Sequence, residues 1–284
     1  FSVDATSKSL DFHGGQTIAT HHWTGSATNK EYGPMADFDC TGEYTLSVWF
    51  QPTHSGNYDT ANTQAASGPL ITGKDTNGRS WGLYMAGQNS LTGDGTGYLY
   101  QQVCFQFVYH DGTNPKAITN NDYANGMRVK RGEWCNIVVT KNADHSIKMR
   151  LGGADFYVNT TNHTDTMVNL TMETAVTDTP DIGYIPKYLG ETTQNGMCFI
   201  GLSSMRNLIA TPAATKGPMA VYTINSSTYN MACGTTDGTT AYVTTTSTAA
   251  KCWAWNIAIG EVGVFDWGFT LADAQALFAA RAVW

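Results

Sequence analysis

Short segments in which apolar and polar residues alternate recur along this 284-residue chain, and turn-forming residues separate them. The clearest segment covers 43–52. It places Tyr44, Leu46, Val48 and Phe50 on one face and Thr45, Ser47 and Trp49 on the other. Alternation with a period of two is typical of a strand with one buried face, and Pro52 ends the run because proline cannot donate to a sheet. The pattern predicts an all-β sandwich or barrel.

The last part of the chain carries the one helical pattern. An alternating segment begins at Ile259, and Thr270 then precedes a run with a helical period. A threonine at this position can cap the free N–H groups of the first turn, and Asp273 favours the same end. We expect a helix from Thr270 to about Ala280 that buries one apolar face, made of Leu271, Ala274, Leu277 and Phe278.

We expect further strands at 9–15, 69–73, 80–85, 103–109, 132–140, 146–151, 155–158, 181–183 and 198–202, with loops elsewhere. The longest predicted loops are 53–68, 110–131 and 203–256. No linker divides the chain and no fixed-period repeat is visible. The sequence therefore predicts a single domain, 1–284, with a long insertion at about 203–256.

Composition narrows the classes of function. Only 14% of residues are charged, and the net charge is −7. The basic residues do not cluster, which argues against nucleic-acid binding. No apolar run reaches the roughly 18 residues of a membrane span. Low charge with abundant threonine, serine, asparagine and glycine is typical of cell-surface and secreted binding modules and of virion shells.

The six cysteines lack a C-x-x-C spacing, so they do not indicate a zinc ribbon or a thioredoxin-like site. Cys233 and Cys252 bracket a glycine- and threonine-rich segment and form our candidate disulfide, which would stabilise the fold by about 3 kcal/mol. Cys104 and Cys135 lie in two β-patterned segments. They either face each other across strands or serve as small buried hydrophobic residues.

Several segments, in the same order, resemble the laminin-G-like, concanavalin A-like lectin jelly rolls. The 44–53 segment is similar to the family's "F-T-I-S-A-W-V-K-P-T" strand, and the closing 259–277 segment to its final strand and helix. Four more segments fit the family's order: 9–15, 70–74, 81–84 and 132–140. The resemblance implies an antiparallel β-sandwich with a short C-terminal helix and long loop insertions.

Members of this family often bind calcium through acidic side chains near the sandwich edge. Here His13 and Gly260 stand at two positions where the family usually has an acid, while Asp11 and Glu261 remain as candidate calcium ligands. Calcium takes about 6–8 oxygen ligands, so the lost carboxylates weaken this expectation. We leave calcium binding as an open alternative.

The same jelly roll also hosts glycoside hydrolases, and the resembling β-glucanases carry E-x-D-x-E on one strand. This chain has six glutamates, and no two lie within five residues of each other. That motif is therefore absent, as are G-x-S-x-G and H-E-x-x-H. We expect a non-enzyme, with hydrolysis by carboxylates from distant strands as the alternative.

Aromatic residues are the remaining functional signal, since sugar rings stack on exposed aromatic faces while polar groups bind their hydroxyls. We assign Trp49 and Trp134 to packing. The candidate ligand-binding residues are Trp81, Tyr84, Trp253 and Trp255, with core or subunit packing as the alternative at each. We expect a glycan-binding or adhesion module, extracellular or on a cell or virion surface. The alternative is a structural decoration, spike or sheath subunit that assembles with itself or with other surface proteins.

Overall fold

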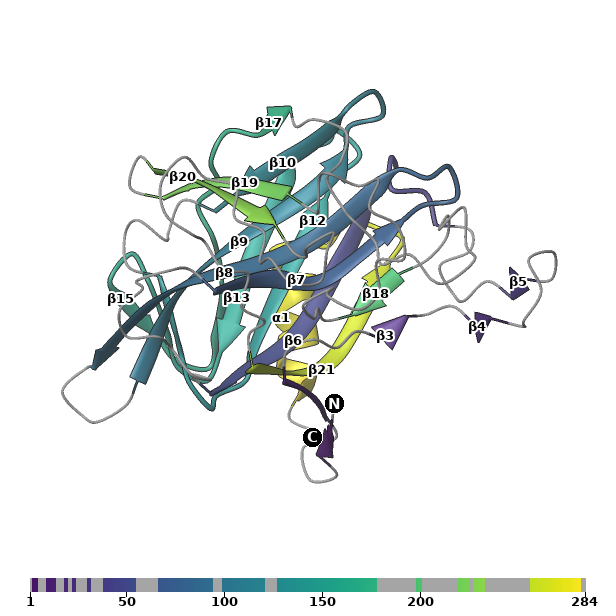
Figure 1. Cartoon of the computed structure of the whole chain (residues 1–284). Helices are drawn as coiled ribbons and strands as arrows, with labels where there is room; N and C mark the ends of the chain where they lie inside the picture. Colours follow the sequence, from purple (N-terminus) through teal and green to yellow (C-terminus); the bar gives the residue numbers. More distant parts are fainter. Residues whose placement is uncertain are drawn as a thin grey trace.

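The computed structural model describes residues 2–4, 9–13, 18–19, 22–23, 30–31, 38–54, 66–93, 99–120, 127–177, 198–200, 219–224, 227–232 and 256–281. Within these residues the fold is an all-β sandwich of two large antiparallel sheets with a short C-terminal helix (Figure 1). This confirms the fold class predicted from the alternating segments.

The first sheet has seven strands among the described residues, and neighbouring strands all run antiparallel. Their spatial order is β1 (Ser2–Asp4), β2 (Ser9–His13), β21 (Asn256–Phe265), β6 (Tyr44–His54), β12 (Cys135–Lys141), β13 (Ile147–Gly153) and β16 (Thr166–Asn169). The closing strand β21 therefore lies between strands from the first fifth of the chain.

The second sheet has ten strands in the described part of the chain. Its main path is β15 (Thr161–His163), β14 (Phe156–Val158), β11 (Arg128–Lys130), β9 (Leu99–His110), β8 (Ser80–Gly93), β7 (Ala66–Lys74), β18 (Cys198–Ile200) and β3 (Ile18–Ala19). β10 (Pro115–Thr119) pairs with β9, and β17 (Val176–Thr177) pairs with β10. Two short hairpins lie outside both sheets: β4 (His22–Trp23) with β5 (Lys30–Glu31), and β19 (Met219–Ile224) with β20 (Ser227–Ala232).

The core lies between the two sheets and follows the predicted alternation. In β6 the buried inner face is Tyr44, Leu46, Val48 and Phe50, as the sequence indicated. The second sheet contributes an opposing set that includes Trp81, Leu83, Phe105 and Phe107. Phe50 and Phe105 meet edge to face with ring centroids 5.8 Å apart, which joins the two sheets.

The helix α1 (Leu271–Ala280) covers the outer face of the first sheet. Thr270 caps its start in a capping box with Asp273, as predicted, and Ala274 and Phe278 are buried. Phe278 stacks on Trp49 with ring centroids 5.5 Å apart. Trp134 packs against the same cluster, so the assignment of both tryptophans to packing is confirmed.

Two predicted loops contain regular structure. The 110–131 segment holds β10 and β11, because the turn signal at Asp111-Gly112 closes a hairpin instead of starting a long loop. The 203–256 segment contains the β19–β20 hairpin, and its residues 203–218 and 233–255 lie outside the described residues. The strand expected at 181–183 also lies outside them. The single-domain organisation stays a prediction.

The predicted disulfide between Cys233 and Cys252 falls on residues that the structure does not describe. Cys135 is a thiol buried on β12, so it is not bonded to Cys104, and it serves as a small buried hydrophobic residue. Within the described residues, no helix is long and apolar enough to cross a membrane.

Candidate functional site

Five connections gather at one end of the sandwich, which we call the loop end. They are 38–43 before β6, 75–79 between β7 and β8, 111–114 between β9 and β10, 142–146 between β12 and β13, and 266–270 between β21 and α1. Because paired strands are antiparallel, the end of one strand lies beside the start of the next, and hairpin turns collect at the same edge. Polar side chains are concentrated here.

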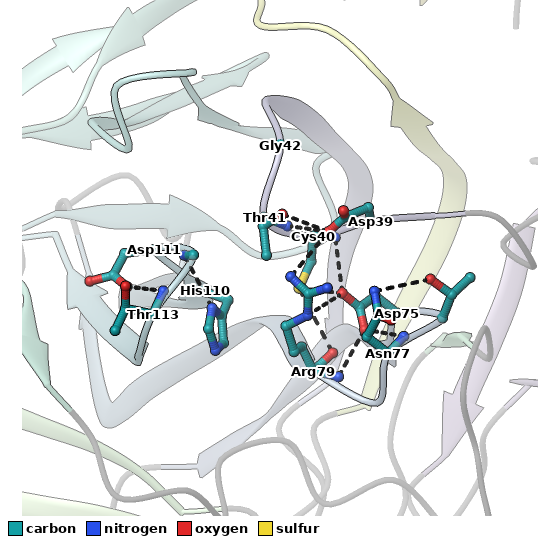
Figure 2. Close-up of polar contacts among 12 residues, drawn as sticks. Asp39, Cys40, Thr41, Gly42, Asp75, Asn77, Arg79, His110, Asp111 and Thr113 are labelled. Carbon is teal, nitrogen blue, oxygen red and sulfur yellow. Dashed lines mark hydrogen bonds and ion pairs between the residues drawn. The ribbon is translucent and has the colours of Figure 1, made fainter.

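The carboxylate of Asp75 holds two of these connections together (Figure 2). It is completely buried. Its Oδ1 accepts backbone hydrogen bonds of 2.8 Å from Asn77 and from Arg79, while its Oδ2 lies 3.1 Å from the Arg79 Nε and 3.4 Å from the Cys40 Sγ. Arg79 also pairs with Asp39 at 3.4 Å. A carboxylate so fully engaged by its own chain acts as a structural anchor for the 38–43 segment.

A buried lysine fixes the other side of that segment. The Lys141 ammonium group donates hydrogen bonds of 2.6 Å to the backbone carbonyls of Thr41 and Gly42. Burial disfavours the charged amine and lowers the pKa of Lys141. The 38–43 segment is thus anchored to both sheets, which sets the position of the next residue, Glu43.

A second network anchors the connection from β21 to α1. The Thr45 hydroxyl donates to the Trp267 carbonyl at 2.9 Å and accepts from the Phe269 N–H at 3.0 Å. Arg150, also buried, donates to the Phe269 carbonyl at 3.1 Å and to the Thr140 hydroxyl at 3.0 Å. The backbone on both sides of Gly268 is therefore held by side chains from β6 and β13.

The anchored connection between β21 and α1 exposes the side chain of Trp267. It is 49% exposed and is the one large exposed apolar side chain that the described residues contain. Its ring meets Phe265 at 5.3 Å and Phe269 at 5.6 Å, so neighbouring rings limit its movement. An exposed aromatic ring on a supported backbone is a suitable platform for a flat apolar ligand face.

Two side-chain oxygens lie against Gly268, the residue that follows Trp267 in the chain. A methyl group placed on Gly268 would lie 3.2 Å from the Glu43 carboxylate Oε2 and 3.2 Å from the Asn142 amide oxygen. Glu43 comes from the segment before β6, and Asn142 from the β12–β13 turn. The tertiary fold thus brings a carboxylate and an amide from two distant connections to the residue that follows Trp267.

The predicted aromatic platform is wrong at the two candidate residues that the structure describes, Trp81 and Tyr84. Trp81 has no exposed surface and Tyr84 is 1% exposed, because Trp81 packs between the sheets and Tyr84 is covered on the opposite face of β8. Neither ring offers a face to a ligand, so this part of the prediction is corrected to core packing. Trp253 and Trp255 lie outside the described residues.

Sequence reasoning missed Trp267, although it stands in the closing segment that the fold prediction used. The available signal was its position in Asp266-Trp-Gly268, a turn-like tripeptide between a strand and a helix cap. A large aromatic residue in a turn has no neighbouring strand to cover it. Asn142 and Glu43 gave no signal because the sequence separates them by 99 positions.

The structure describes the side chain of one of the two candidate calcium ligands. Glu261 is exposed in a bulge of β21. Asp11, on β2, lies opposite Ala258 of β21, and the side chain of Asp11 is not described. A side chain at Gly260 would lie 3.2 Å from the Trp134 ring, so an acidic residue there would be crowded. The described residues contain no cluster of three or more histidines, cysteines, aspartates or glutamates. Calcium binding stays an open alternative.

No protein-family model and no curated protein matches this chain. Among solved structures, the binding domain of botulinum neurotoxin serotype G aligns over 98% of this chain and 48% of its own, with 8% identity and a TM-score of 0.39. A structure of botulinum neurotoxin type C, whose cell entry depends on interaction with two ganglioside molecules, aligns over 98% and 48%, with 10% identity and a TM-score of 0.34.

This chain spans about half the length of those two structures. At TM-scores this low and with about one residue in ten identical, the similarity carries no argument about function. The resemblance to laminin-G-like jelly rolls stays a prediction, and the assignment to an all-β sandwich rests on the strand pairing described above.

Proposed function

We propose that this protein is a non-catalytic glycan-binding or adhesion module that acts outside the cell or on a cell or virion surface. The observation that carries the proposal is the exposed Trp267 ring, which Phe265 and Phe269 support at the loop end of the sandwich. Carbohydrate sites combine such an apolar platform with a few polar groups that fix the orientation of the sugar.

The anchored backbone around Trp267 favours a ligand-binding role for this ring over incidental exposure. The Thr45 hydroxyl and the Arg150 guanidinium hold the backbone on both sides of Gly268, so the ring is presented without a large loss of backbone freedom on binding. A single exposed apolar side chain needs no explanation by itself. The combination of an exposed ring with a backbone held by buried side chains is what supports a ligand site.

The test is a glycan array probed with the wild-type protein and with Trp267→Ala. We expect saturable binding that Trp267→Ala reduces at least tenfold. Tyr157→Ala is the matched control, because Tyr157 is a partly exposed aromatic residue on β14 in the other sheet. Circular dichroism would establish that both variants are folded, and the bound oligosaccharide should be recovered uncleaved.

The alternative is a structural subunit of a surface assembly. Stable oligomers in light scattering, together with no binding to any glycan on the array, would favour that function and reject the glycan-binding proposal. Equal binding by the wild type and Trp267→Ala would instead show that the site lies elsewhere.

A further inference from the structure

Two short strands end the two large sheets on one side of the sandwich. In the part of the chain that the structure describes, β15 ends the second sheet and β16 ends the first, and two residues connect them. Each strand holds an asparagine that is followed two positions later by a threonine: Asn162 with Thr164, and Asn169 with Thr171. Asn-x-Thr is the acceptor pattern for N-linked glycosylation.

The fold presents the first of these acceptors to solvent. Residues two apart on an extended chain share one face. Asn162 and Thr164 are both exposed. His163 lies between them and points inward, where it stacks on the buried Phe156 with ring centroids 5.3 Å apart. The two residues that define the acceptor therefore lie on the open face of the hairpin.

The second acceptor has the same arrangement. Asn169 and Thr171 are exposed, and Leu170 between them is buried. Neither Asn162 nor Asn169 uses its side-chain amide in a hydrogen bond within the described residues. By contrast, the amide of Asn136 donates to Ser47, and that of Asn142 donates to Ser146. The contacts of the fold thus leave both acceptor amides available for reaction.

A third sequence of this kind begins at Asn159, where the asparagine has a structural explanation. Asn159 and Thr160 form the two-residue turn between β14 and β15, and both have a left-handed backbone, with φ of 49° and 65°. Asparagine is favoured at the first position of such a hairpin turn. The fourth sequence, at Asn225, lies outside the described residues.

The two terminal strands lack common protections of a sheet edge. A terminal strand leaves backbone N–H and C=O groups without a partner strand, and proteins cover such edges with charged side chains, proline or bulges. β15 is Thr-Asn-His and β16 is Thr-Met-Val-Asn, so neither contains a lysine, a carboxylate or a proline. Their shortness protects them in part, and a bulky polar glycan on each would complete the protection.

An aromatic ring lies within reach of Asn162. Asn162 pairs directly with Tyr157 of β14. Opposed residues of an antiparallel pair place their side chains on the same face, with Cβ atoms about 4.5–5.5 Å apart. Tyr157 is partly exposed, and its ring is supported by Tyr100 at 5.1 Å and by Arg128 at 5.7 Å. A sugar attached to Asn162 therefore has an apolar surface beside it.

We propose that Asn162 and Asn169 carry N-linked glycans and that the first sugar on Asn162 packs against Tyr157. The donor is an oligosaccharide on a lipid pyrophosphate, which the secretory pathway of the producing cell supplies together with the transferase. The bond from sugar C1 to the pyrophosphate oxygen breaks, a bond from C1 to the asparagine Nδ2 forms, and the amide loses one proton. The inference rests on the location given in the proposed function, and not on the Trp267 site.

Mass spectrometry tests the two acceptors. Protein isolated from the cells that naturally produce it should lose mass when treated with peptide N-glycosidase F. In heavy-oxygen water this treatment converts each glycosylated asparagine to a labelled aspartate, and we expect the label at Asn162 and Asn169. An unchanged mass, or a label at Asn159 in place of Asn162, would overturn the proposal.

Matched variants secreted from cultured eukaryotic cells assign each glycan. Thr164→Ala and Thr171→Ala each remove one acceptor and should each remove one glycan. Thr164→Ser and Thr171→Ser keep the hydroxyl group and should keep the glycan. A glycan on Asn162 or Asn169 that persists in the corresponding alanine variant would contradict the assignment.

A double-mutant comparison tests packing on Tyr157. Tyr157→Ala should lower the melting temperature by about 2 °C more in the glycosylated chain than in Thr164→Ala, which has lost the sugar on Asn162. Tyr157→Phe keeps the ring and should behave like the wild type in both backgrounds. Equal effects of Tyr157→Ala in the two backgrounds would show that the sugar does not pack there.

Light scattering tests the protective role of the glycans. The double variant Thr164→Ala/Thr171→Ala should self-associate at lower protein concentration than the wild type, and equal association would refute protection of the edges. Protein made in a bacterium that lacks the transferase has no such glycans. Its binding to the glycan array, with and without Trp267→Ala, tests the proposed function separately.

Discussion

The Thr45 hydroxyl donates a hydrogen bond of 2.9 Å to the backbone carbonyl of Trp267, although 222 residues separate the two in the chain. The same oxygen accepts from the Phe269 N–H at 3.0 Å. One side chain at the start of β6 therefore fixes both ends of the Trp267–Phe269 turn. Because that turn presents the exposed ring, the stability of the closing segment and the geometry of the site are linked.

Replacing Thr45 with valine keeps the shape of the side chain and removes its hydroxyl. The buried N–H of Phe269 then loses its acceptor, so we expect the free energy of unfolding to fall by about 1–3 kcal/mol. Urea denaturation measures the loss. Thr161→Val, at an exposed position on the short strand β15, should change the midpoint little. A Thr45→Val midpoint equal to that of the wild type would show that this hydroxyl does not hold the turn.

Gly152→Ala tests how closely α1 packs on the first sheet. A methyl group on Gly152 would lie 2.7 Å from the Phe278 ring and 3.1 Å from Met167. Overpacking of this kind costs roughly 1–3 kcal/mol, and here it would displace α1 from Trp49. Gly42→Ala is the control, because its nearest neighbour would be 3.8 Å away. Thermal unfolding followed by circular dichroism compares the two, and equal melting temperatures would contradict the close packing of α1.

Asp75→Asn tests the anchor at the loop end. If the amide oxygen keeps the hydrogen bonds from the backbone N–H groups of Asn77 and Arg79, its NH₂ group faces the Arg79 side chain. In the opposite orientation those two N–H groups face the NH₂ group, and Arg79 meets an uncharged oxygen. Loss of charge-assisted hydrogen bonds predicts destabilisation of about 1.5–3 kcal/mol. Asp266→Asn, at an exposed position, should cost far less. Chemical denaturation measures the free energy of unfolding of both variants. An equal loss in the two would contradict the anchoring role of Asp75.

Stability should fall in alkaline solution, in part because of Cys135. Burial raises the pKa of this thiol to about 12, from 9.0 in an exposed thiol. The unfolded chain releases the proton above pH 9.0, while the folded protein keeps it until about pH 12. The contribution is therefore complete below pH 9.0 and is lost as the pH rises, at about 1.4 kcal/mol per pH unit.

Cys135→Ala isolates this contribution from other groups that titrate at high pH. Urea unfolding under reducing conditions should show that the difference in stability between the wild type and the variant narrows from pH 8 to pH 11. A constant difference across that range would mean that the thiol is accessible to water in the folded state.

Much of the scaffold could be predicted because its determinants are local. The alternation through Tyr44–Phe50 identified both the strand and its buried face, since a period of two assigns side chains to faces whatever the partner strands are. The capping box at Thr270 identified the helix start, because its two hydrogen bonds join residues three positions apart. Errors arose where pairing decided the structure, as in β10, a five-residue segment that begins with a proline and forms a strand only because β9 is beside it.

The candidate site could not be predicted in the same way. Trp81 and Tyr84 have a sequence environment as suitable for a platform as that of Trp267. Yet the strand β8 is covered on both faces at these two residues, and the turn after β21 is not. Whether an aromatic ring is exposed depends on what packs over it, and that is a property of distant segments.

The sequence by itself determined which segments form strands, which face of β6 is buried and where the closing helix begins, because these depend on spacing along a few residues. Only the tertiary structure decided that Glu43 and Asn142 meet at Gly268 and that the neighbouring Trp267 ring stays exposed. Antiparallel pairing places β6, β12 and β21 side by side, and this register brings turns from distant parts of the chain to one end of the sandwich.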